Sequence, residues 1–463
     1  MTVALLSITA SLVAYEAGTH ARLTARAAVA SRVDATLRAW GLREGLYQGL
    51  RVDVEHLDRR AAFRLRERLA RVDPTWGGAA DERGSQRALG WLVAGSVLEE
   101  APASRGRHHF LDPRDGSGLV EPRPGIEWLL GAVAGADGEG SLAGALAGTN
   151  FTMVGEPADR WAISAENEWS VTTFHRELRS AVLDPDSTRR SAAMARALLA
   201  LGSVAHVLQD MASPTHVRND LVGGHLATPD SSTFDRSSRY ERFVALAHAE
   251  IGPPTVPPPP ATALRARFVA LATATQRAFF SPGTLPSPVQ LLPGTTAERA
   301  EAEANAGAPY PEPVVSGIDF RRESGYLAGA GVPHLASYRI DRTGRLRFDL
   351  DERCWADQAR VLLPWAGAHS TGLLDHLARP GPRVSILSDG TAYVDAASLS
   401  PRAGHVVVFW EDEKGIRREL ERHAVGAPAQ PVAVPTEAVR LGAMLDGLDE
   451  RGEPVVAARV IDL

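Results

Sequence analysis

Apolar positions repeat at helical spacing through the first half of the chain. Residues 20–104 carry Ala and Leu at a period near 3.6 with few β-branched runs, and residues 156–212 continue this pattern up to Pro214. A further segment of the same kind covers residues 350–377. Together they predict a mainly α-helical body, because an apolar stripe on a helix must be buried against other helices.

The periodicity changes after the sequence RPGPR at residues 379–383. From there, short β-type runs alternate with Gly, Asp and Pro, which is typical of strands joined by tight turns. The expected strands are residues 384–387, 392–395, 405–410, 416–420, 432–435 and 455–461. The pattern predicts a small all-β, sandwich-like domain at residues 383–463, after a helical domain at residues 15–377.

Two segments are expected to lie outside this scheme. Residues 250–335 are rich in Pro and Gly, include the run PPTVPPPP, and predict a long excursion from the helical domain. Residues 1–14 contain an apolar stretch as long as a signal-peptide core, although no basic residue precedes it. This stretch is either a signal segment of a secreted or periplasmic protein, a first buried helix, or the product of a start site placed too late.

Composition limits the kinds of metal site. The chain has 463 residues, a formal net charge of −6 and one cysteine, Cys354. One cysteine excludes an internal disulfide scaffold and any Cys-rich zinc or iron–sulfur site, so a metal would be bound by carboxylates and by some of the 14 histidines. No apolar run approaches the roughly 20 residues of a membrane-spanning helix, so no transmembrane segment is expected.

The segment at residues 202–220, GSVAHVLQDMASPTHVRND, carries the candidate chemistry. It continues a strongly helical run, so His206 and Asp210 lie on one helix face, and the two oxygens of Asp210 could bridge two ions. His216 would lie about 15 Å from His206 along a straight helix. Because Pro214 ends or kinks the helix, His216 is expected either to serve a second ion or to be brought back by the kink.

This string resembles the central motif of the zinc-dependent phospholipase C / S1-P1 nuclease superfamily, most closely an uncharacterised bacterial branch with GxxxHxxQDMxxPxHxRND. Other similar segments are Thr19-His20 with Leu23-Thr24, GSVLEE at residues 95–100, HHFLDP at residues 108–113, and residues 354–376. The resemblance implies a largely helical fold that holds three zinc ions through His, Asp or Glu and through the amino group of a processed N-terminal residue.

Carried over residue by residue, the resemblance implies a set of metal ligands. They are Tyr15, His20, Glu100, His109, His206, Asp210, His216 and Glu241. Tyr15 would serve after cleavage behind Ala14. Glu100 stands where the family usually has Asp, and Glu99 replaces it if the register is shifted by one. The identity of the last ligand stays open between Glu241, Asp220 and His225.

The implied reaction is hydrolysis of a phosphodiester by a metal-activated water. Neighbouring zinc ions lower the pKa of a bridging water, and a further ion can polarise the phosphoryl oxygens. Asp210 would bridge two ions and Glu100 could also act as a base, so these two are the expected catalytic residues. The three ions would be held by His20 with the Tyr15 amine, by His109, His206 and Glu100, and by His216 with Glu241.

Three functions remain open on the sequence. A phospholipase C is favoured by the HFLDP segment and by the appended β-domain, which docks on membranes in some family phospholipases and would make a peripheral membrane contact. A single-strand nuclease would need a base-stacking aromatic such as Phe110 and positive charge from Arg105, Arg107 or Arg218. A non-catalytic, zinc-stabilised binding protein with an immunoglobulin-like β-domain is favoured by the presence of Glu100 instead of Asp.

Overall fold

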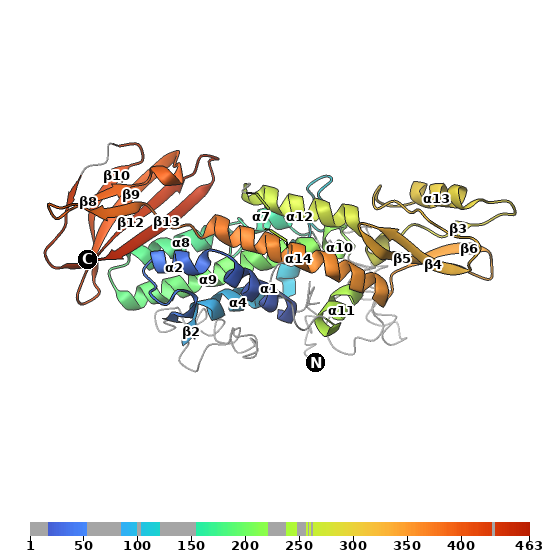
Figure 1. Ribbon diagram of the computed structural model, residues 1–463, viewed down its shortest axis with the longest axis horizontal. Coiled ribbons are helices and arrows are strands. Elements are labelled where there is room, and N and C mark those ends of the chain that lie inside the picture. The colour runs from blue at the N-terminus through green and yellow to red at the C-terminus, as the bar shows by residue number, and fades with distance from the viewer. Residues whose placement is uncertain are drawn as a thin grey trace, which may run out of the picture.

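The computed structural model describes most of the chain, and it confirms a mainly helical protein with a small all-β part at its C-terminal end (Figure 1). The described residues are 17–52, 85–99, 103–120, 154–220, 238–247, 256–257, 259–260, 263–427 and 431–463. The molecule is elongated, with the C-terminal sheets at one end, the helices in the middle and a smaller sheet at the other end.

The helical body is built around α9 (Ser187–Gln209), whose first turn is capped by the Asp186 carboxylate. The other helices are α1 (Ala17–Ala30), α2 (Val33–Ala39), α4 (Ala88–Leu98), α7 (Ala158–Trp161), α8 (Val171–Leu183), α10 (Pro214–Val217), α11 (Arg239–Ala247), α12 (Leu264–Ala278), α13 (Ala297–Ala306) and α14 (Glu352–Leu377). Short 3-10 turns are η1 (Gly45–Tyr47), η3 (Ala103–His108), η4 (Asp210–Ala212), η6 (Pro282–Thr284) and η7 (Ala397–Leu399).

The central helix contains a long apolar run. In the described part of the chain, Ser187–Ala212 is long and apolar enough, by length and composition alone, to cross a membrane, although no apolar run of that length was expected from the sequence. Such a helix does not by itself make a transmembrane segment. However, 89% of its most apolar window is buried inside the protein, where it packs against α4, α8 and α14. A helix that is apolar all round is typical of a protein core as well as of a membrane span.

The excursion predicted from Pro and Gly contains regular structure. Strands β3 (Val289–Gln290), β4 (Ser324–Gly329), β5 (Val332–Ile340) and β6 (Arg345–Asp349) form an antiparallel sheet in the order β3-β6-β5-β4. Ala330 and Gly331 join β4 to β5 with φ of 50° and 76°, which suits a tight hairpin turn. A further short pair, β1 (Gly49–Arg51) with β2 (Ser85–Arg87), interrupts the region predicted as wholly helical.

The C-terminal part consists of two antiparallel sheets. Its strands are β7 (Arg383–Ile386), β8 (Thr391–Asp395), β9 (Ala403–Asp412), β10 (Arg417–Ala424), β11 (Val432–Ala433), β12 (Ala438–Leu448) and β13 (Pro454–Asp462). They are ordered β10-β9-β12-β13 and β11-β8-β7. Six of these strands lie where the sequence predicted them, whereas β12, a central strand, was missed.

The four-stranded sheet is buried on both faces, which binds the β-part to the helical body. Along β9, Val406 and Val408 belong to the core between the two sheets, while Val407 and Phe409 join the main core of the helical body. This division follows the two-residue period of a strand, whose successive side chains point to opposite faces. One face of the four-stranded sheet therefore belongs to the main core of the helical body, and the core between the two sheets is a separate cluster.

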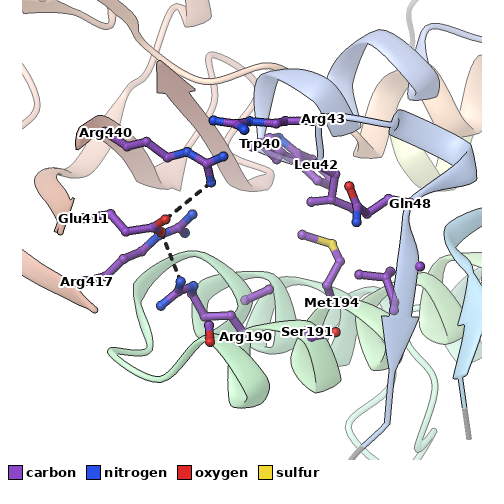
Figure 2. A pocket seen from close by; sticks show the side chains of 15 residues that line it. Trp40, Leu42, Arg43, Gln48, Arg190, Ser191, Met194, Glu411, Arg417 and Arg440 are labelled. Carbon is purple, nitrogen blue, oxygen red and sulfur yellow. Dashed lines mark hydrogen bonds and ion pairs between the residues drawn. The ribbon is translucent and has the colours of Figure 1, made fainter. Parts of the chain in front are cut away.

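An ion-pair cluster borders the same junction. Figure 2 shows the Glu411 carboxylate beside Arg190 of α9, Arg417 of β10 and Arg440 of β12, at the edge of a cavity of about 380 Å³. The nitrogen–oxygen distances are 3.0 Å to Arg190, 2.7 Å to Arg417 and 3.3 Å to Arg440. Arg417 also donates to the Val182 carbonyl of α8 (2.7 Å). A single buried carboxylate is thus shared by three guanidinium groups from both parts, and Arg440 also pairs with Asp462 at 2.8 Å.

We expect Glu411→Gln to lower the free energy of unfolding by about 3 kcal/mol, because it leaves buried guanidinium groups without their counter-charge. Urea denaturation followed by circular dichroism would measure the loss. Glu419→Gln is the matched control, since Glu419 lies on β10 in an exposed pair with Arg422 and should change stability by less than about 1 kcal/mol. Equal stability of both variants would contradict the role given to Glu411.

Candidate metal site

Helices α4 and α9 cross at a contact made by two glycines. A Cβ atom at Gly95 would lie 2.0 Å from the Leu199 carbonyl oxygen, and one at Gly202 would lie 1.9 Å from the Leu92 carbonyl oxygen. Both distances are far below van der Waals contact, so only glycine permits this spacing. The sequence therefore places a residue without a side chain on each helix where the two backbones meet.

This crossing orients His206. The residue after Gly95, Ser96, brings its carbonyl oxygen to 2.6 Å from His206 Nδ1. Because a carbonyl only accepts, Nδ1 carries the proton and Nε2 keeps its lone pair. His206 Nε2 then faces the Asp210 carboxylate, 3.3 Å from Oδ2, as the i, i+4 spacing predicted.

Helix α1 contributes His20, whose orientation is fixed by Gln209. His20 Nδ1 lies 2.7 Å from Gln209 Oε1, and His20 Nε2 lies 3.2 Å from Asp210 Oδ1. The Gln209 amide nitrogen donates to the hydroxyls of Thr24 (3.0 Å) and Ser370 (3.2 Å). These two contacts turn the amide oxygen toward His20, so the His20 ring presents Nε2 to Asp210.

His109 approaches Asp210 from the loop after η3. Its Nδ1 lies 2.9 Å from Asp210 Oδ2, and its Nε2 lies 3.3 Å from Glu99 Oε1. The two oxygens of Asp210 are thus divided: Oδ1 faces His20, while Oδ2 faces His109 and His206. All of these side chains are fully buried.

The site centres on an ionised carboxylate. Burial alone would raise the pKa of Asp210, but the rings of His206, His20 and His216 hold this pKa well below its usual value. His20, His206 and Asp210 offer ligand atoms that all lie within 4.8 Å of one another and could hold a metal ion. Imidazole nitrogens with a carboxylate oxygen are donors that zinc accepts readily, so the residues present fit such an ion.

Glu99 has a supporting position beside this cluster. Its carboxylate accepts hydrogen bonds from Arg105, from the Ser203 hydroxyl and, at 2.9 Å, from Trp161 Nε1. Burial would raise the pKa of Glu99, but Arg105 and His109 hold it below its usual range. Its charge is therefore compensated by Arg105 while Oε1 faces His109. The predicted ligand Glu100, for which Glu99 was the alternative, lies outside the described residues, as does Tyr15.

His216 returns toward the cluster because the helix is interrupted. After η4, Ser213 is extended (φ −103°, ψ 120°) and Pro214 starts α10. His216 Nδ1 then lies 2.8 Å from the His109 carbonyl oxygen, and Nε2 lies 3.5 Å from Glu241 Oε1. Burial lowers the pKa of His216, but Asp210 and Glu241 raise it more, and the net pKa is raised.

Glu241 is held in place by the start of its own helix and by the break after α9. Its Oε1 accepts from the Ser213 hydroxyl (2.8 Å), and its Oε2 accepts from the Ser238 backbone N–H (2.8 Å). Of the two rivals, Asp220 accepts from the backbone N–H of Gly283 in η6 (2.7 Å), and His225 lies outside the described residues. Glu241 is therefore the candidate that the structure brings to His216.

The adjacent His108 does not share this role. Its ring stacks on Trp161 at a centroid distance of 4.0 Å, and its Nδ1 accepts from the Glu156 backbone N–H (2.8 Å). Burial, together with the positive charge of Arg107, lowers the pKa of His108 to about 4. His108 is a neutral packing residue, and His109 is the member of the pair that faces Asp210.

The side chains expected to bind a nucleic acid are largely engaged inside the protein. Arg218 is 2% exposed, contacts two aromatic rings, and donates to backbone carbonyls and to Thr284. Arg105 is held by Glu99 and Asn167. Phe110 is fully buried and stacks on His216 at 4.5 Å. Of the four side chains predicted to bind a nucleic acid, only Arg107 is exposed.

The residues that orient the ligands were not predicted from the sequence. Gly95, Ser96, Gly202 and Gln209 were read only as parts of motifs, although they set the positions of the rings. A signal was present, because the pair Gly-Ser occurs in both GSVLEE and GSVAHV. A glycine on each of two predicted helices allows their backbones to approach closely, because neither has a Cβ.

Comparisons with known proteins add little to this geometry. No family model matches the chain, and no curated protein matches it. Among solved structures, the alpha toxin from Clostridium absonum has a TM-score of 0.27 and 9% identity, over 98% of this chain and 92% of its own. The Clostridium perfringens alpha-toxin from avian strain SWCP has a TM-score of 0.27 and 10% identity, over 98% and 93%. A likeness at this level establishes neither a shared family nor a shared activity.

We expect Gly202→Ala to lower the free energy of unfolding by about 2 kcal/mol, because its methyl group would overlap the α4 backbone and separate the helices. Chemical denaturation would measure this loss. Gly307→Ala, at the end of α13, is the control, since its new Cβ would lie 3.5 Å from the Glu303 carbonyl oxygen, an ordinary contact. Unchanged stability of Gly202→Ala would refute the close crossing.

Proposed function

We propose that this protein is a zinc-dependent phosphodiester hydrolase of the phospholipase C kind. The observation that carries the proposal is the buried Asp210 carboxylate surrounded by His20, His109 and His206. Two of these rings are oriented by hydrogen bonds at Nδ1, which leaves Nε2 directed at the carboxylate. Outer hydrogen bonds of this kind commonly orient metal-binding histidines.

The residues that would hold zinc fall into two neighbouring groups. Asp210 with His20, His109 and His206 forms one, and His216 with Glu241 forms the other. Tyr15 and Glu100 complete the proposed ligand set of up to three ions. Bound zinc supplies a water of lowered pKa and neutralises negative charge on a phosphate.

The chain's own residues prepare this chemistry. Gln209 holds His20, and Ser96 holds His206, in the tautomer that can bind a cation. Glu99 orients His109 in the same way, through His109 Nε2. Burial strengthens the electrostatic interactions among these side chains, because little water screens their charges. We assign the catalytic roles to Asp210, as the residue shared between ions, and to Glu100, as a candidate base.

A lipid substrate is favoured over a nucleic acid. Arg105 and Arg218 are engaged by internal partners, and Phe110 is buried. None of the three is therefore available to bind a base or the phosphate backbone of a nucleic acid. The β7–β8 hairpin, in contrast, exposes Ile386, Leu387 and Tyr393, each at least 40% accessible. We propose that this hairpin makes a peripheral membrane contact and that the protein works as a secreted or periplasmic enzyme.

We expect His206→Ala and Asp210→Asn to lose bound zinc and to reduce hydrolysis of a chromogenic phosphodiester by at least about a hundredfold, since each removes a ligand of the shared centre. Elemental analysis of the purified protein would count the ions. His405→Ala, which alters an exposed histidine of β9, should leave both readouts unchanged.

The substrate class is then decided with the zinc-loaded wild-type protein. Release of diacylglycerol from phosphatidylcholine vesicles, without degradation of single-stranded DNA or RNA, is the expected result. The reverse pattern would identify a nuclease. A zinc-containing protein that hydrolyses no diester would favour the binding-protein interpretation over an enzyme.

A further inference from the structure

A second cavity lies at the junction of the helical body and the β-part, away from the cluster around Glu411. Its volume is about 580 Å³, and it is bordered by the C-terminal end of α14, by α12, by η7 and by the β12–β13 turn. Charged side chains dominate its lining. They are Arg32, Arg267, Arg379, Arg451 and Arg459, with Asp375, Asp449 and Glu450.

The acidic side chains here already have partners. Asp375 lies 3.3 Å from Arg32, and Asp449 lies 3.3 Å from Arg379. Glu450 lies 3.8 Å from Arg451. The nearby Glu453 carboxylate faces His376 (3.1 Å) and accepts from the backbone N–H of Leu264 (2.8 Å). These contacts leave the arginines of the cavity in excess over its carboxylates.

Two arginines of the cavity, Arg267 and Arg459, have buried donors without an acceptor among the described residues. Arg267 is only 3% exposed, yet its Nε and Nη1 atoms have no hydrogen-bond partner in the described part of the chain. Arg459 likewise has a buried Nε without a partner. No carboxylate of the described residues lies within 4 Å of either guanidinium. A buried donor without an acceptor is costly, and more so when it is charged.

The chemistry of these donors selects an anion. A guanidinium group presents planar, paired N–H donors that match the oxygens of a phosphate or carboxylate. A phosphate carries several acceptor oxygens and up to two charges, so a single group can accept from more than one arginine, and both Arg267 and Arg459 line this cavity. The cavity has far more room than a phosphate ion fills, which leaves space for an organic substituent.

We propose that this junction cavity binds the phosphate group of a phosphomonoester, with Arg267 of α12 and Arg459 of β13 as its donors. The ligand joins a helix of the body to a strand of the β-part, so its binding stabilises their association. The site uses none of the residues of the metal cluster and does not depend on the proposed hydrolase activity.

Calorimetry and thermal unfolding of the full chain with inorganic phosphate and with glycerol 3-phosphate test this proposal. Sodium chloride at equal ionic strength is the reference. Wild-type protein should bind both phosphates and unfold at a higher temperature in them, because ligand that binds only the folded state stabilises it. Arg267→Met and Arg459→Gln should each weaken binding about tenfold or more.

The variants also separate a ligand site from a purely structural role. Without phosphate, Arg267→Met should be at least as stable as wild type, since it removes a buried charge that lacks a partner. Arg265→Gln is the matched control on α12, because Arg265 pairs with Asp159 at 2.7 Å and its loss should preserve the phosphate response. Asp210→Asn should preserve it too, which separates this cavity from phosphate bound at a metal.

Vesicles distinguish a lipid-borne from a soluble phosphate. If the protein binds phosphatidic acid vesicles over phosphatidylcholine vesicles, and Arg267→Met loses this preference, the phosphate belongs to a lipid. If only the soluble phosphates bind, and the Arg267 variant loses them, it belongs to a soluble ester. A wild-type response to phosphate no larger than to chloride, or an undiminished response of Arg267→Met, would overturn the proposal.

Discussion

The contact between the backbones of α4 and α9 at Gly95 and Gly202 is the constraint on which the candidate metal site depends. The contact fixes the position of the His206 ring, because the carbonyl oxygen that orients this ring belongs to Ser96, the neighbour of Gly95. The same crossing brings the Ser203 hydroxyl to Glu99. One close approach therefore positions both His206 and Glu99, and a methyl group added at Gly95 or Gly202 would disturb both residues.

Around that crossing, the structure compensates every buried charge that it brings together. Asp210 is surrounded by imidazoles, Glu99 is paired with Arg105, and Glu241 receives hydrogen bonds before it meets His216. Burying a carboxylate without such partners would cost several kcal/mol. The polar interior thus lowers the pKa of Asp210 and of Glu99, so these two carboxylates remain ionised, which is the state that binds a cation.

The sequence could predict local spacing but not long-range pairing. The i, i+4 relation of His206 and Asp210 follows from helix geometry, and the break at Pro214 follows from the missing N–H of proline. The meeting of His20 with Gln209 joins residues 189 positions apart, and no periodicity encodes it. Strand β12 was missed because its Gly442 and Gly447 weaken a β-pattern, although close neighbours require these glycines. The roles of Tyr15 and Glu100 rest on resemblance alone.

Helix α14 connects the two sites that these observations define. In its C-terminal half, Ser370 accepts from the Gln209 amide that orients His20. Near its end, Asp375 and His376 line the junction cavity. The 26-residue helix buries Ser370, Leu373 and His376 between these two points. The same helix therefore contributes one residue that orients the Gln209 amide beside His20 and two residues that line the junction cavity.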